Sequence, residues 1–157
     1  MFPGQLGKGK TFHAQRSGGV ACKEGMARKN GMIMTTWISA PMIDAYRQLH
    51  RLGHAHSVEI WQDDQLQAGL YGLSLGRVFC GESMFSHIDN GAKLAMVALC
   101  RHFAHHGGAL IDCQMQNPFL ATLGVQEWPR KQFLSALTTL SRQPLLDGCW
   151  QARRISP

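Results

Sequence analysis

The chain has 157 residues, of which 45% are hydrophobic, and it carries a formal net charge of +6. This length and composition are typical of one globular domain that buries a core. There is no apolar run near the roughly 20 residues that a membrane-spanning helix needs, and no apolar stretch follows the basic N-terminus as in a secretory signal. Scattered cysteines without CxxC spacing favour reduced thiols in a cytoplasmic protein over a zinc site or disulfides. They are Cys22, Cys80, Cys100, Cys113 and Cys149.

The N-terminal segment, residues 1–34, carries most of the net charge. It holds six basic residues against Glu24 alone, which gives +5, and the other ten basic and nine acidic residues give +1. The segment also contains seven of the 17 glycines and keeps no period of 2 or 3.6 residues, so we expect irregular structure. Such a basic segment either binds phosphates without sequence preference or is a solvated extension. We place the folded domain at residues 35–157.

The first half of this domain is predicted to be a helix followed by three strands. Ser39 and Pro41 are typical of a helix start, and Gly53 is typical of its end. Apolar alternation and turn residues then predict an antiparallel meander. Its strands are expected at residues 57–61, 65–73 and 77–85.

The second half is predicted to alternate helices and strands. Asp89 or Asn90 can cap a helix that runs to about His106, and the apolar residues 109–114 form a strand, which makes the helix a crossover. Further elements are expected as a short helix near 118–123, a strand near 125–128, a helix from Pro129, and a strand within 148–157. The apolar residues of the helix from Pro129 are predicted to face inward, namely Phe133, Leu134, Leu137 and Leu140. This order predicts an α/β (α+β) fold with a mixed, largely antiparallel sheet flanked by helices. It is similar to the middle and end of the GCN5-related N-acetyltransferase fold.

Glu82 is a carboxylate in an otherwise apolar strand, within the sequence FCGESMFS of residues 79–86. Charged residues are seldom fully buried unless they are paired. Glu82 therefore either accepts hydrogen bonds from a cationic amine, such as the α-amino group of an amino acid, or forms an ion pair with Arg77 or Lys93. Asp112 stands in a second apolar segment, LIDCQ. Two such segments in a small domain predict a pocket with a few fixed polar groups.

Asp112 and Gln114 are two residues apart, so on a strand both side chains would point to one face. We interpret them as an acid that acts through an amide on a nucleophilic amine, since Gln is a poor base unless a carboxylate polarises it. Alternatively, Asp112 caps the turn after the strand. Nearby apolar side chains line a pocket, stack on a nucleic-acid base, or belong to the core. They are Trp37, Phe79, Met84 and Phe85.

A metal site and a phosphate-binding loop are both disfavoured. His102, His105 and His106 have a spacing that can chelate a metal, but their position at a helix end explains them without a metal ion, so we predict no metal site. The pattern GxxxxGK[ST] is absent, as is the Q/R-x-x-G-x-G/A loop that binds acetyl-CoA in N-acetyltransferases. We therefore expect no cofactor.

Several segments together resemble the bacterial leucyl/phenylalanyl-tRNA–protein transferase family. The most specific are LGHAHSVE at residues 52–59, FCGESMFS at 79–86 and LIDCQ at 110–114. Their order and spacing hold from about Thr36 to Pro157. Residues 1–34 do not resemble the N-terminal domain of the family, which has a Trp-Trp-Ser-Pro type motif. We therefore expect a member that lacks this domain.

The resemblance implies transfer of Leu, Phe or Met from aminoacyl-tRNA to proteins that begin with Arg or Lys, which marks them for degradation by the N-end rule pathway. By position it makes Asp112 and Gln114 the catalytic pair, and it puts Glu82 at the bound aminoacyl group. It also assigns residues around the 3′ adenosine and the side-chain pocket, namely Trp37, Leu70, Phe79, Met84 and Ser86. We expect a cytoplasmic monomer without a membrane partner.

Two other functions stay open. One is an acyl-CoA N-acetyltransferase of the same fold, against which the missing acetyl-CoA loop argues. The other is a non-catalytic remnant that binds tRNA or a peptide through its basic segment. Since the missing N-terminal domain helps to build the aminoacyl and tRNA site in the family, we expect impaired turnover from this chain.

Overall fold

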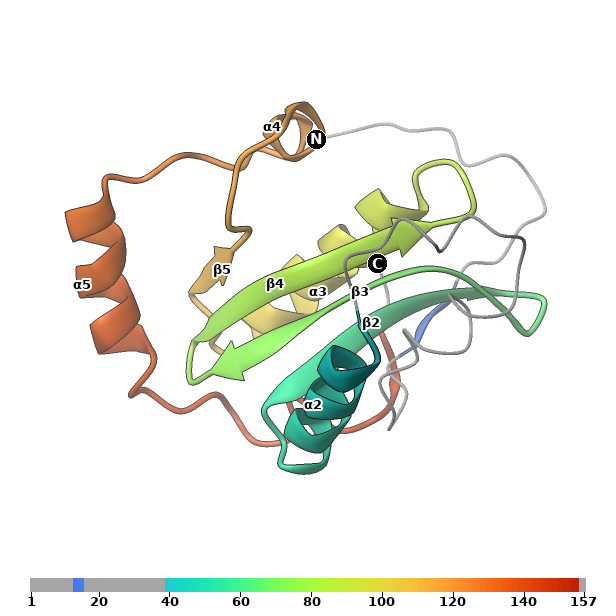
Figure 1. Ribbon diagram of the computed structural model, residues 1–157, viewed down its shortest axis with the longest axis horizontal. Helices are drawn as coiled ribbons and strands as arrows, with labels where there is room; N and C mark the ends of the chain where they lie inside the picture. Colours follow the sequence, from blue (N-terminus) through green and yellow to red (C-terminus); the bar gives the residue numbers. More distant parts are fainter. Residues whose placement is uncertain (1–12, 16–38, 156–157) are drawn as a thin grey trace.

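The computed structural model describes residues 13–15 and 39–155, and its strands form one mixed sheet flanked by helices (Figure 1). The predicted fold class is therefore confirmed. No helix in the described ranges is long and apolar enough to cross a membrane. The strands are β1 (His13–Gln15), β2 (Ala55–Gln62), β3 (Gln65–Leu75), β4 (Val78–Ser86), β5 (Leu110–Asp112) and β6 (Arg154–Ile155). The helices are α2 (Ala40–Arg51), α3 (Gly91–His105), α4 (Pro118–Thr122) and α5 (Arg130–Leu140).

The sheet has the strand order β5-β4-β3-β2-β1-β6. The pairs from β4 to β6 are antiparallel, and only β4 and β5 run parallel. The meander β2-β3-β4 is thus confirmed, and so is the role of α3 as the crossover that a parallel pair requires. This crossover brings β5, which carries Asp112, beside β4, which carries Glu82.

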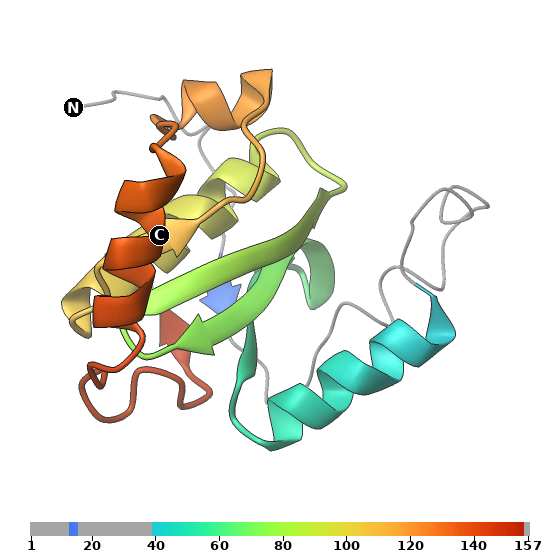
Figure 2. The ribbon, with the colours of Figure 1, turned by 60° about the vertical axis from the view of Figure 1, so that its left-hand side comes forward.

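Helices α2 and α3 cover opposite faces of the sheet, as Figures 1 and 2 show. On the α3 side, Leu70 of β3 belongs to the main hydrophobic core. The next residue, Tyr71, points the other way and meets Tyr46 of α2 edge to face, with ring centroids 5.2 Å apart. The core on the α3 side includes Val58, Ile60, Phe79, Ala95, Leu99 and Phe103.

Gly72 lies at a close contact between β3 and β4. A Cβ atom at this position would lie 2.1 Å from the Cys80 carbonyl oxygen and 2.7 Å from the Phe79 ring. Backbone cannot yield cheaply at such a contact, so Gly72→Ala should lower the free energy of unfolding by about 1–3 kcal/mol or more. Urea denaturation measures this loss. Gly53→Ala is the comparison, because a Cβ there meets nothing within 4 Å and only its positive φ is strained. Equal stability of Gly72→Ala and the unmodified chain would contradict the prediction.

Three expectations need correction. Residues 125–128 form no strand with any described partner, because the Val125 amide bonds to the Leu120 carbonyl and closes the turn after α4. Helix α5 buries none of its residues fully, and Leu134, predicted to face inward, is 43% exposed. Residues 13–15 form β1, a regular strand inside the segment 1–34 that we expected to be irregular.

Candidate active site

Glu82 occupies a β-bulge in β4. Tyr71 pairs with Ser83 and Gly72 pairs with Gly81, so that Glu82 is the extra residue between two paired positions. A bulge breaks the alternation of a strand and redirects a side chain, which is why bulges are frequent beside functional sites. The carboxylate in the apolar strand therefore stands at a local irregularity of the sheet.

The partner of Glu82 is a hydroxyl group, since the carboxylate accepts a hydrogen bond from Tyr46 of α2. Burial, and then the hydrogen bond and the negative charge of Glu82, raise the pKa of Tyr46, so the phenol stays protonated as a donor. Within the described residues Glu82 forms no ion pair with Arg77 or Lys93. Arg77 instead donates to the Gly107 carbonyl oxygen and, over 2.7 Å, to Gln143 Oε1. The ion-pair interpretation of Glu82 is therefore wrong.

A pocket of about 250 Å³ lies between β4, α3 and the segment after β5. Most of its walls are apolar, and Glu82 and Gln114 are among its polar groups. Five of the predicted site residues line it, namely Leu70, Phe79, Glu82, Met84 and Gln114. A mostly apolar pocket with a few convergent polar groups is the usual form of a site for a small ligand or part of one.

Asp112 ends β5, which lies next to β4 in the sheet. In the parallel register Asp112 pairs with Cys80, two residues before Glu82. The Asp112 Oδ1 atom accepts a hydrogen bond from the Gln114 backbone amide over 2.8 Å. Asp112 therefore holds the turn after the strand, as the alternative interpretation proposed. That contact is compatible with a second role, because a carboxylate has further lone pairs.

Gln114 does not lie on a strand, since β5 ends at Asp112 and Gln114 has the left-handed backbone angle φ of 61°. The argument from strand alternation, which put both side chains on one face, is therefore wrong. The turn nevertheless keeps the two residues together, because the hydrogen bond joins the carboxylate of one to the backbone of the other. A left-handed non-glycine residue held by such a contact is frequent at functional sites.

A second, larger groove of about 1050 Å³ opens on the other side of the segment after β5. It is lined by Asp112, by residues 124–128, which include the acidic Glu127 and the half-exposed Trp128, and by the basic Arg130. Gln114 and Cys113 line both this groove and the smaller pocket. The segment 111–115 is thus a common wall between an apolar pocket and an open groove with acidic groups.

Cys80 lies near both acids without being a nucleophile itself. Burial, and then the charges of Asp112 and Glu82, raise the pKa of its thiol to about 11. Since the thiolate is the reactive form, alkylation of Cys80 at pH 8 should be roughly a hundredfold slower than that of an unhindered thiol, and it should speed up as the pH rises toward 11. Peptide mapping after timed iodoacetamide treatment measures this rate. Rapid labelling of Cys80 in the native chain at pH 8 would contradict it.

Among the predicted site residues that the structure describes, Ser86 and Asp112 do not line the smaller pocket. The hydroxyl of Ser86 donates to the Ile88 carbonyl oxygen over 2.6 Å and holds the turn between β4 and α3. Trp37 lies outside the described residues. Tyr46, by contrast, was missed as the partner of Glu82. Its sequence signal was only the apolar stripe of α2, which does not distinguish a packing tyrosine from a hydrogen-bond donor.

Comparisons of the chain with known proteins identify its family. The family model described as leucyl/phenylalanyl-tRNA protein transferase matches residues 20–138, and so begins inside the segment 1–34. The curated leucyl/phenylalanyl-tRNA–protein transferase of Aeromonas hydrophila is 82% identical over 120 residues, which are 76% of this chain and 51% of that protein. Those of Tolumonas auensis and Pectobacterium carotovorum are 55% and 54% identical over 121 residues, which are 77% of this chain and 52% of each protein.

The chain spans about half the length of the curated relatives that it matches. The family match, in turn, covers the meander, the crossover helix and the segment after β5 that carry the pocket. On these matches the chain belongs to the leucyl/phenylalanyl-tRNA–protein transferase family.

Proposed function

We propose that this chain carries the acyltransferase half of an enzyme that moves Leu, Phe or Met from aminoacyl-tRNA to the N-terminal Arg or Lys of a protein. The observation that carries the proposal is the common wall formed by residues 111–115, which lines both an apolar pocket and an open groove with two carboxylates and Arg130. Transfer between two substrates requires two sites that meet at one place. Gln114 lines both.

The smaller pocket suits the transferred amino acid. Leu70, Phe79 and Met84 offer apolar contacts to a side chain, and Glu82 can accept hydrogen bonds from its α-amino group. An apolar pocket of this kind admits the Cβ-unbranched Leu, Phe and Met, whereas Ile and Val would clash near Cβ. The open groove suits the acceptor, because it offers the carboxylates of Asp112 and Glu127 to a cationic N-terminal residue, and these outnumber its one cation, Arg130.

The reaction requires that the acceptor amine is positioned at the ester and that a nearby group accepts its proton. The acceptor amine attacks the ester carbonyl carbon, a C–N bond forms, the C–O bond to the tRNA breaks, and the 3′ oxygen leaves with a proton. The ester is already activated, so correct positioning of the amine supplies much of the acceleration. Asp112 and Gln114 would hold the amine and relay its proton. In this scheme the product is a destabilising N-terminus of the N-end rule pathway.

The test is transfer of labelled Phe from Phe-tRNA to a peptide that begins with Arg. We expect slow transfer, because the chain spans about half of its relatives. A peptide with an acetylated N-terminus is the matched control and should accept nothing. Robust transfer would refute the impairment. Acetyl-CoA protection in a thermal shift experiment would favour an N-acetyltransferase instead, and tRNA binding that vanishes on deletion of residues 1–34, without turnover, would favour a binding remnant.

A further inference from the structure

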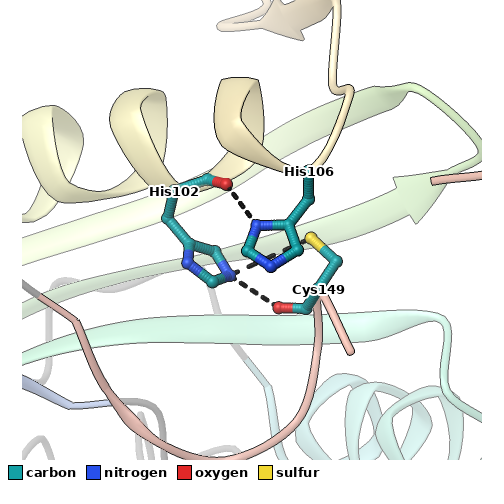
Figure 3. Close-up of side chains that lie close together, drawn as sticks. All are labelled: His102, His106 and Cys149. Atoms are coloured by element: carbon teal, nitrogen blue, oxygen red, sulfur yellow. Dashed lines mark hydrogen bonds between the residues drawn. The ribbon is translucent and has the colours of Figure 1, made fainter. Parts of the chain in front are cut away.

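We propose that His102, His106 and Cys149 form a binding site for a borderline-soft divalent metal ion of the zinc type, which ties α3 to the C-terminal segment. The three side chains lie away from the pocket and are 8%, 6% and 3% exposed. Their ligand atoms all lie within 4.8 Å of one another. Figure 3 shows both imidazole rings and the thiol converging on one point between α3 and the C-terminal segment.

The two histidines are placed so that both could bind one metal ion. They stand four residues apart at the end of α3, so they share one face of the helix, and their ring centroids are 4.3 Å apart. The Nδ1 atom of His106 donates to the His102 carbonyl oxygen over 2.7 Å. A donor bond of this kind fixes the tautomer and leaves Nε2 with a lone pair, as it does in known metal-ligating histidines.

Cys149 supplies the third ligand from a distant part of the chain. Its Sγ atom lies 3.9 Å from His102 Nε2. With zinc–sulfur and zinc–nitrogen bonds of about 2.3 and 2.1 Å, ligand atoms of one tetrahedral ion lie about 3.3–3.8 Å apart. Side-chain rotations of modest size would therefore bring the three atoms to bonding distance.

Hydrogen bonds already made by the ligand atoms compete with the ion. His102 Nε2 donates to the Cys149 carbonyl oxygen over 2.6 Å, and Arg153 Nη2 donates to His106 Nε2 over 2.5 Å. On binding, the proton of His102 moves from Nε2 to Nδ1, the long exposed Arg153 swings away, and the Cys149 thiol loses its proton to solvent. The net change is one proton released for each ion bound.

The ligand set defines the class of ion. Two imidazoles and a thiolate suit zinc, cobalt(II) or copper, whereas magnesium and calcium prefer oxygen ligands. The fourth coordination position would be filled by water or by a backbone oxygen. Because the ion would bind the folded chain and not the unfolded one, it would raise the thermal midpoint.

The experiment titrates the whole chain with zinc and with cobalt(II). We expect one ion per chain by calorimetry, and a near-ultraviolet thiolate-to-cobalt charge-transfer band. Cys149→Ser should abolish that band, and His106→Ala should weaken binding at least about tenfold. Arg153→Ala should bind more tightly than the unmodified chain, because it removes the donor that competes for His106 Nε2.

The expected result for Arg153→Ala is a gain of affinity, which a misfolded variant would not show. It therefore tests the proposal even if another variant fails to fold. Matched controls are His105→Ala and Cys100→Ser, which alter exposed residues of α3, and Cys22→Ser, which removes the cysteine of residues 1–34. All three should keep the cobalt band. Absence of the band from the unmodified chain, or its persistence in Cys149→Ser, would overturn the proposal. The three residues would then only join α3 to the C-terminal segment by hydrogen bonds. These readouts do not involve aminoacyl transfer.

Discussion

Asp112→Asn should lower the rate of aminoacyl transfer by at least about 100-fold, the usual contribution of a positioned proton acceptor. The substitution is informative because Asp112 also holds a turn, through its bond to the Gln114 amide. Asparagine keeps an oxygen that can accept this bond but lacks the negative charge. The turn and the pocket wall should therefore persist while the proton acceptor is lost.

The measurement is single-turnover transfer of labelled Phe to a peptide that begins with Arg, with the chain in excess over Phe-tRNA. Asp89→Asn is the matched control, because this exposed carboxylate in the turn before α3 lines neither the pocket nor the groove. Its rate should equal that of the unmodified chain. Transfer by Asp112→Asn at the unmodified rate would remove Asp112 from the proposed mechanism and leave it as a turn residue alone.

Phe79→Ala should lower the free energy of unfolding by about 3–5 kcal/mol. Phe79 is 0% exposed, and its ring packs against those of Phe103 and Trp150 at centroid distances of 6.1 and 5.5 Å. Truncation removes apolar contacts from the sheet, from α3 and from the C-terminal segment at once. Since domains of this size are stable by only about 5–15 kcal/mol, the loss is a large fraction of the total.

Urea denaturation followed by tryptophan fluorescence measures this loss. Phe79→Leu, which leaves a smaller cavity, should lose less. Leu146→Ala is the surface control, because this side chain is 63% exposed and its substitution should change stability by no more than about 0.5 kcal/mol. A midpoint for Phe79→Ala close to that of Leu146→Ala would show that the site collapses around the smaller side chain.

The sequence alone predicted the elements whose patterns are local. The meander β2-β3-β4 follows from apolar alternation interrupted by turn residues, and α3 follows from an apolar stretch that ends at two glycines. The predicted side-chain cap of α3 is wrong, because Asn90 at the N-cap position makes no capping hydrogen bond through its side chain. Where the sequence placed a strand at 125–128, it failed because a short apolar run forms a strand only if an edge is available to pair with it. There the backbone of Val125 is used by the turn after α4.

The site was only partly predictable for the same reason. The five residues that line the smaller pocket were predicted as site residues from the family resemblance, and their roles stay predictions; they are Leu70, Phe79, Glu82, Met84 and Gln114. The relative position of Asp112 and Gln114 was predicted wrongly, because a turn with a left-handed residue follows Asp112 in place of a continued strand. The Tyr46 hydroxyl on Glu82 also depends on how α2 packs against the sheet.

What the sequence by itself determined about this protein is its lineage and its local elements, because these depend on residues that are neighbours along the chain. Tertiary structure alone decided which distant groups meet. It put a hydroxyl of α2 on the carboxylate of the β4 bulge. It also left His105 exposed and brought Cys149 to His102 and His106 across more than 40 residues of chain. No spacing in the sequence encodes such a meeting, since it depends on how the C-terminal segment packs against α3.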